Sequence, residues 1–254
     1  MKIVVLVKQV PDTWGDRRLD IATGILDRTM GDQVIDEIDE RALEIALLCK
    51  DATKAEVVAL TMGPAQAVDI LRKSLAMGAD SAIHILDDSL AGADLGVTAR
   101  ALAAAISRAG ADLVIAGNES TDGRGGVVPA MIAEHLGIPS ATFLDAVTID
   151  AEKVSGSRAT DYGTMTVSAT LPAVISVTER SAEPRFPSFK GILSAKKKPI
   201  ETLTVAALDV QPTGASTVVV STAQRPARAT GTTIVDSGDA GVKLAEFLAD
   251  NRLI

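Results

Sequence analysis

The sequence predicts an α/β protein with a Rossmann-like, mostly parallel sheet, and three observations lead to this fold class. Four short apolar runs alternate with amphipathic stretches within roughly the first 140 residues, which is typical of parallel strands joined by right-handed crossovers. Hydrophobic residues make up 47% of the chain, enough for a substantial core. Aromatic residues make up only 2%, so the core is aliphatic, as suits a sheet covered by helices on both faces.

The first half of the chain reads as alternating strands and helices. Pro64 fits the first turn of a helix because its missing N–H needs no partner there, and Gly78 and Gly110 end two helices. The polar residues 11–34 read as an excursion before the first helix. Strands are expected at residues 3–7, 56–61, 82–86 and 113–116, and helices at 36–49, 63–77, 95–109 and from about 126 onward. The loops after the first, second and fourth strands should meet at the carboxyl edge of the sheet, where such folds bind ligands.

The pattern changes after Pro139. Strand-like runs then follow one another without long helices between them, at residues 146–149, 153–157, 164–170 and 173–177. Many of their residues are β-branched, and we expect them to extend the sheet in antiparallel fashion. Residues 183–199, which contain Pro, Ser and Lys, are expected to form a loop.

The C-terminal part differs in composition from the rest. Residues 211–238 hold few large apolar side chains and cannot build a core of their own, yet an amphipathic helix is expected at 240–249. We therefore divide the chain into an α/β domain at residues 1–210 and a C-terminal arm at residues 211–254. Such an arm either embraces another subunit or folds back on its own domain.

Composition excludes several classes of function. A net charge of −8 argues against nucleic acid as the main partner, because phosphate backbones select basic surfaces. Cys49 is the only cysteine and the two histidines stand at unrelated spacings, so we expect neither an intrachain disulfide nor a metal site. No apolar run approaches about 20 residues, so no membrane span is expected. The first residues are too short and too soon charged for a signal peptide, which predicts a cytoplasmic protein.

A glycine loop is the most informative motif. An apolar run is followed by a polar loop with Gly117, Gly123, Gly125 and Gly126, and then by a helix. This order of strand, loop and helix presents backbone N–H groups to an anion, commonly a phosphate. The alternative is an ordinary loop whose glycines only supply positive φ angles. No nucleophile elbow, phosphate-binding lysine loop or G-x-G-x-x-G motif is present, so no catalytic residue is predicted.

Six strings, in this order, resemble the β subunit of electron transfer flavoproteins. They stand at residues 8–13, 62–65, 76–80, 117–139, 158–163 together with 171–176, and 183–198. The resemblance implies an adenine-nucleotide-binding α/β fold over residues 1–210 and an arm that packs on an α subunit. It also implies a bacterial heterodimer that shares FAD with the α subunit and holds a structural AMP, or a second FAD in the electron-bifurcating branch. Electrons would come from donors such as acyl-CoA dehydrogenases and pass to a membrane quinone oxidoreductase or another acceptor.

The resemblance also assigns cofactor-binding residues. They are Leu6, Asp36, Ile38, Asp39, Met62, Gly117, Asn118, Glu119, Ser120, Thr121, Asp122, Gly123, Arg124, Gly125, Gly126, Val127 and Val128. Asp36 fits a helix N-cap equally well, and Leu6 and Met62 fit the core. Relatives that hold a second FAD carry polar groups near the helix start, where this chain has Val127 and Val128, so AMP is favoured. Arg124 supplies a charge that can hold a phosphate.

The same resemblance assigns a partner-recognition loop. Its residues are Arg185, Phe186, Phe189, Ile192, Lys196, Lys197 and Lys198. Phe189 is either an exposed anchor for a dehydrogenase pocket or a core residue under the loop. The lysines either steer an acidic partner or form an ordinary solvated face. Arg158 and Asp161 read as a surface salt bridge or a subunit contact, and Trp14 and Tyr162 receive no role.

A different class of function remains open, namely an adenylating or ATP-cleaving enzyme of similar fold. Such an enzyme needs a glycine-rich pyrophosphate loop early in the chain. The first loop, residues 8–12, contains no glycine. A homodimeric nucleotide-sensing protein is a further alternative, and it would lack residues 183–254.

Overall fold

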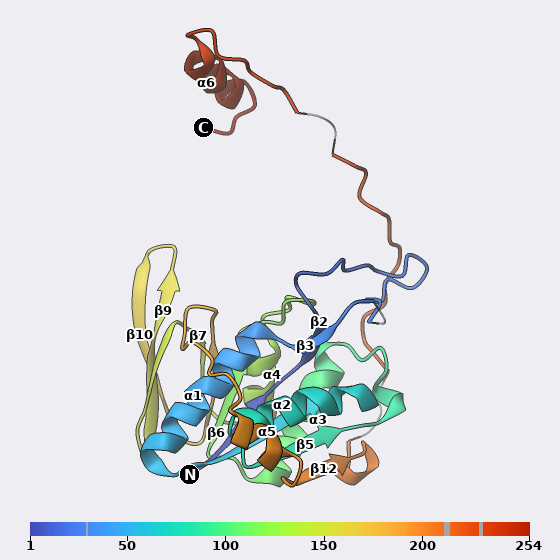
Figure 1. Ribbon diagram of the computed structural model, residues 1–254, viewed down its shortest axis with the longest axis vertical. Coiled ribbons are helices and arrows are strands. Elements are labelled where there is room, and N and C mark those ends of the chain that lie inside the picture. Colours follow the sequence, from blue (N-terminus) through green and yellow to red (C-terminus); the bar gives the residue numbers. More distant parts are fainter. Residues whose placement is uncertain (29, 211–213, 229–230) are drawn as a thin grey trace.

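The computed structural model describes residues 1–28, 30–210, 214–228 and 231–254, and a seven-stranded parallel sheet forms its centre (Figure 1). The strand order is β12-β5-β4-β1-β6-β11-β7, and each neighbouring pair is parallel. The strands are β1 (Lys2–Leu6), β4 (Glu56–Met62), β5 (Ser81–Ile85), β6 (Leu113–Gly117), β7 (Ser140–Leu144), β11 (Ala173–Val177) and β12 (Ile200–Leu203). The predicted fold class is confirmed.

Helices cover both faces of this sheet. They are α1 (Glu37–Thr53), α2 (Val68–Met77) with the preceding 3-10 turn η1 (Ala65–Ala67), α3 (Leu95–Ala109), α4 (Val128–Leu136) and α5 (Phe189–Ala195). Side chains alternate along β1, because successive residues of a strand point to opposite faces. Ile3 and Val5 pack in one core with α1 and α2, whereas Val4 and Leu6 pack in the other with α3 and α4.

The second half of the chain differs from its prediction. The run at 173–177 does not extend the sheet in antiparallel fashion, because β11 lies between β6 and β7 and is parallel to both. All five of its residues are buried, as in a central parallel strand. The antiparallel strands form a separate three-stranded sheet of β8 (Ala146–Ile149), β9 (Lys153–Thr160) and β10 (Gly163–Thr170). The prediction also missed β7 and β12, and placed a loop where α5 forms.

The excursion after β1 is bounded by a small ladder. β2 (Gln9–Pro11) pairs antiparallel with β3 (Gln33–Ile35), so the chain leaves the body and returns at the same place. At the other end of the chain, the body closes with the 3-10 turn η3 (Ala206–Leu208). The expected arm boundary at residue 211 lies outside the described residues. The last helix, α6 (Ala240–Asp250), has no buried residue and stands away from the body in Figure 1.

Candidate functional site

A cavity of about 730 Å³ opens at the carboxyl edge of the parallel sheet, and we call it the edge cavity. The ends of β1, β4 and β6 line it together, so the three loops expected to meet do meet. Residues that follow β5 and the start of α3 complete the wall. This place and this volume are typical of small-molecule sites in α/β proteins.

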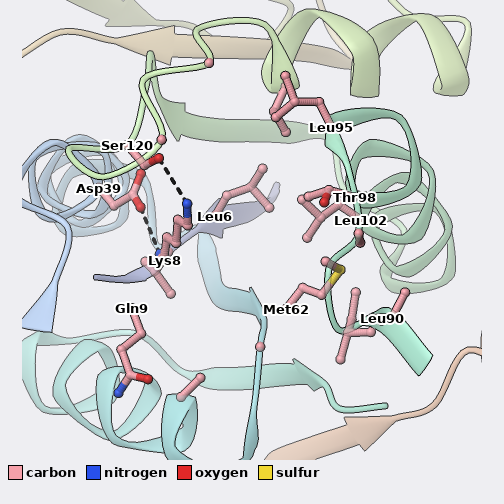
Figure 2. Close-up of a pocket in the computed structure, with 18 of the residues that line it drawn as sticks. Leu6, Lys8, Gln9, Asp39, Met62, Leu90, Leu95, Thr98, Leu102 and Ser120 are labelled. Carbon is pink, nitrogen blue, oxygen red and sulfur yellow. Dashed lines mark hydrogen bonds between the residues drawn. The ribbon is translucent and has the colours of Figure 1, made fainter. Parts of the chain in front are cut away.

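The two sides of the edge cavity differ in chemistry (Figure 2). Lys8, Asp39 and Ser120 bring charged and polar groups to one side. The opposite side is apolar and is formed by Met62, Leu90, Leu95 and Leu102, with the hydroxyl of Thr98 among them. A ligand with one apolar planar part and one anionic part matches this division.

Asp39 joins two strand ends at the polar side. Its Oδ2 accepts a hydrogen bond from the backbone N of Lys8 at 2.8 Å, and its Oδ1 accepts one from the N of Gly117 at 3.0 Å. Burial, together with the charge of Asp36, raises the pKa of Asp39 well above its usual value. A Cβ on Gly117 would lie 2.6 Å from this Oδ1, so only glycine fits there. Asp39 thus ties β1 to β6 at the edge of the cavity.

Asp36 caps a helix and holds the glycine loop at the same time. Its Oδ1 accepts from the backbone N of Ile38 at 3.0 Å, which confirms the N-cap interpretation. Its Oδ2 accepts from the backbone N and the Oγ1 of Thr121, at 2.6 and 2.8 Å. Both oxygens are therefore used within the protein. Asp36 supports the loop from behind.

Asp122 is the centre of an ion cluster. Its side chain is only 2% exposed and pairs with Lys8 Nζ at 2.8 Å and with Arg28 Nη2 at 2.7 Å. Burial opposes ionisation. The hydrogen bond and charge of Lys8, together with hydrogen bonds from Ser120 and Arg28, nevertheless hold the pKa of Asp122 well below its usual range. Lys8 and Arg28 both line the edge cavity. Asp122 therefore positions two cations there.

The glycine loop ends at a helix start that has no side-chain cap. Val127 is the N-cap residue of α4, and no side chain accepts from the first N–H groups of this helix. Gly126 precedes it with φ +66°, and Arg124 has φ +48° with a side chain that is 73% exposed. Free N–H groups at a helix start can bind an anion, although Pro129 in this first turn has no N–H to offer.

The side chain of Asn118 gives an independent indication of a ligand. Asn118 is 8% exposed and lines the cavity, and its Oδ1 is buried without a hydrogen-bond partner. A buried acceptor without a partner is rare in native proteins. A donor on a bound molecule would satisfy it, so the residues present fit a polar ligand.

The assigned cofactor-binding residues fall into two groups. Those that line the cavity are Leu6, Asp39, Met62, Gly117, Asn118, Glu119, Ser120, Gly123, Gly125, Gly126 and Val128. Those that do not line it are Asp36, Ile38, Thr121, Asp122, Arg124 and Val127. Sequence reasoning missed Lys8 and Arg28. Lys8 lies in the first of the six segments that carry the family resemblance, at residues 8–13, whereas no sequence motif lies near Arg28.

The assigned recognition residues also divide. Phe186 and Phe189 are 95% and 79% exposed, so Phe189 is not a core residue. Ile192 is 48% exposed, and Lys196 and Lys197 are exposed as well. The other two members of the set have partners within the chain. Arg185 pairs with Glu44 at 2.8 Å and Asp51 at 3.0 Å, and Lys198 Nζ donates to the backbone oxygens of Leu75 and Ala79.

The β9–β10 hairpin corrects one expectation. Arg158 does not pair with Asp161, because its Nε donates to the backbone oxygen of Thr142 at 2.7 Å and so joins β9 to β7. Tyr162, at the tip, is fully exposed, and Trp14 is 95% exposed. Among the described residues no group of three or more His, Cys, Asp or Glu is placed to hold a metal ion. In the same residues, no helix has the length and apolar character needed to cross a membrane.

Comparison with known proteins agrees with this geometry. Residues 23–208 match the family model of the electron transfer flavoprotein domain. The chain is 48% identical to the electron transfer flavoprotein subunit beta of Mycobacterium leprae, over 99% of both chains. It is 38% identical to the subunit of that name from Thermoanaerobacterium thermosaccharolyticum, over 87% of each, and 37% identical to that of Megasphaera elsdenii, over 82% of this chain and 80% of the relative. The resemblance drawn from the six strings is confirmed, and the chain belongs to the electron transfer flavoprotein family, as a relative of its beta subunits.

Proposed function

We propose that this subunit binds a structural AMP in the edge cavity and, together with an α subunit, carries electrons on a shared FAD. The observation that carries the proposal is a single cavity that is lined by a glycine loop with an uncapped helix start, carries two cations at one side and is apolar at the other. Anions bind at such helix starts, and bases bind against aliphatic walls.

The parts of AMP match the parts of the cavity. Met62, Leu95 and Leu102 would hold the base. The backbone N–H groups of the glycine loop, where Gly123 lies beside Lys8, would hold the phosphate. The unpaired Oδ1 of Asn118 would accept from a ligand N–H or hydroxyl group. Val127 and Val128 bring no hydroxyl or amide to the helix start, which supports one phosphate rather than a pyrophosphate.

The redox chemistry belongs to FAD, which accepts and releases the electrons. The chain itself would supply structure and surfaces, so we propose a carrier subunit rather than an enzyme. The arm would pack on the α subunit, and residues 183–198 would dock donors such as acyl-CoA dehydrogenases. A membrane quinone oxidoreductase or another acceptor would then take the electrons.

Mass spectrometry of the released nucleotides tests the cofactor assignment. The full chain is purified with its α subunit and denatured, and the released ligands are weighed and counted. One AMP and one FAD per heterodimer is the expected result. Release of two FAD molecules and no AMP would show that a second flavin occupies the cavity. Turnover of ATP by the purified complex would contradict the proposal that the subunit is an electron carrier.

Phe189→Ala tests the docking surface. Phe189 is 79% exposed at the start of α5, and its removal leaves the core untouched. We expect electron uptake from an acyl-CoA dehydrogenase to fall about tenfold or more, as for an interface anchor, with flavin content unchanged. Tyr162→Ala is a control of the same type, because Tyr162 is also an exposed aromatic residue but lies at the tip of the β9–β10 hairpin. Equal uptake by the Phe189 variant and the unaltered protein would refute the docking role.

A further inference from the structure

Residues 12–28, which we call the cover segment, close one side of the edge cavity. Ile25, Leu26 and Arg28 of this segment line the cavity. The segment folds on itself through an antiparallel bridge between Leu19 and Leu26. In Figure 1 it is the blue loop that projects beyond β2 and β3. It is therefore part of the site's wall, although it stands outside the α/β body.

Two arginines join the cover segment to the glycine loop. Arg28 donates to Asp122 Oδ2 at 2.7 Å and to the backbone oxygen of Gln9 at 3.1 Å. Arg17 donates to Thr121 Oγ1 at 3.0 Å and also to the backbone oxygen of Thr121. Both acceptor residues belong to the loop that faces the cavity. The cover and the proposed phosphate site are thus parts of one network.

Apolar packing contributes little to this attachment. Leu19, Ile21 and Ile25 are each more than half exposed, at 56%, 58% and 59%, and Trp14 is 95% exposed. Segments with few buried apolar contacts open at low free-energy cost. The arginine bonds are therefore the main ties between the cover segment and the loop. Arg28 is itself 40% exposed, so water can replace its bonds when the segment opens.

We propose that Arg17 and Arg28 are positioning residues that hold the cover segment closed, and that opening of this segment sets the rate at which the adenine nucleotide enters and leaves. This inference rests on the proposed nucleotide site. Neither arginine needs to touch the reacting flavin. Each acts through Asp122 or Thr121, which place the glycine loop.

The exchange rate of bound nucleotide tests the role of Arg17, which joins the cover segment to the glycine loop without lining the cavity. The full chain, in complex with its α subunit, is loaded with radiolabelled AMP and chased with unlabelled AMP. We expect Arg17→Met to raise the dissociation rate about tenfold, as for the loss of one charge-assisted hydrogen bond. Arg17→Lys should restore part of the slow exchange. Arg18→Met is the matched control, because Arg18 lies in the same segment but only faces Asp16 at 3.5 Å.

Trp14 supplies a readout that needs no nucleotide. It is the only tryptophan of the chain and lies on the cover segment. In Arg17→Met, the segmental part of its fluorescence anisotropy decay should become faster, whereas in Arg18→Met it should stay as in the unaltered protein. If the unaltered complex retains no AMP, the proposed function is wrong. The anisotropy decay then tests by itself whether the arginines hold the cover segment closed. Unchanged anisotropy, or unchanged exchange of a nucleotide that does bind, overturns the inference.

Discussion

At the scale of single residues, three aspartates explain how the site is built. Carboxylates are residues that often bind ligands. Here, however, the side-chain oxygens of Asp36, Asp39 and Asp122 accept hydrogen bonds from groups of the protein itself. They join the ends of β1 and β6 to the start of α1 and to the glycine loop. The groups left to face the cavity are then backbone groups, Lys8, Arg28 and Asn118. Acidic residues can stand beside the proposed anion site because they hold cations and N–H groups in place.

Gly117→Ala tests the tight contact behind the cavity. The new Cβ would lie 2.6 Å from Asp39 Oδ1 and 3.1 Å from Ile38 Cγ2, and this region is buried. We expect the free energy of unfolding to fall by about 2 kcal/mol, as for other overpacked sites. Urea titration measures it. Gly241→Ala is the control, because nothing lies within 4 Å of its added Cβ. Equal stability of the two variants would show that the strand ends adjust freely.

Asp122→Asn tests the ion cluster through pH. The pKa of Asp122 is lower in the folded protein than in the unfolded chain. Its contribution to stability is therefore complete above the unfolded value, near 3.9, and is lost as the pH falls through the folded value. We expect the variant to be about 2 kcal/mol less stable at pH 7, and the difference to shrink as the pH falls below about 4. Asp161→Asn, at an exposed hairpin tip, is the control. A difference that stays constant with pH would contradict this account.

At the scale of elements, local patterns predicted the first half of the fold well and the second half poorly. The helix at 95–109 was predicted with its observed bounds because its sequence is rich in alanine and Gly110 follows it, and the structure adds Asp94 as its N-cap. The direction of β11 was not predictable, because parallel or antiparallel pairing depends on which distant strands lie beside it. The helix α5 was missed because its seven residues are stabilised by the Ser188 cap and by packing on α2, which periodicity does not reveal.

The candidate site shows the same division. The glycine loop carried a local signal, since strand, glycines and helix are consecutive in sequence. Arg28 carried none, because its role depends on a contact with Asp122, 94 positions away. Arg185 was assigned to partner binding by resemblance, yet it forms a bidentate pair with Glu44 on α1. Contacts between distant segments are therefore what the sequence alone left out.

Arg185→Met tests whether this pair holds the recognition loop. Glu44 is 5% exposed, and the charge and hydrogen bonds of Glu44 raise the pKa of Arg185 above its usual value. Removing the guanidinium leaves a buried carboxylate without its partner, so we expect a loss of about 3 kcal/mol in the free energy of unfolding. Calorimetry or urea titration measures it. Arg180→Met, at an exposed position just before this loop, should lower the free energy of unfolding by less than about 0.5 kcal/mol. If Arg185→Met leaves the free energy of unfolding unchanged, the pair does not hold the loop, and Arg185 remains available to a partner.

At the scale of the whole molecule, we propose that the chain divides into a body that is stable by its own packing and an arm that is not. Both cores lie between residues 3 and 208, one on each face of the parallel sheet. In the described residues, the arm contacts the body where Ser216 N donates to Asp94 Oδ2 at 2.7 Å, and it contacts the cover segment where Thr222 Oγ1 donates to the backbone oxygen of Ile21. The apolar residues of α6, such as Leu244 and Phe247, remain 51% and 42% exposed. A helix of this composition needs a second surface to bury them.

Removal of residues 214–254 tests this division. Because the arm adds no residue to either core, the thermal midpoint of the isolated subunit should change by less than about 2 °C. Association with the α subunit should be lost or weakened at least a hundredfold, since the apolar face of α6 would no longer be available to a partner. Calorimetry and analytical ultracentrifugation measure the two effects, and Leu244→Ser with Phe247→Ser in the full chain separates loss of that face from loss of length. A truncated subunit with a clearly lower thermal midpoint would show that the arm stabilises the fold. A truncated subunit that binds the α subunit with unchanged affinity would show that the arm is not needed for assembly.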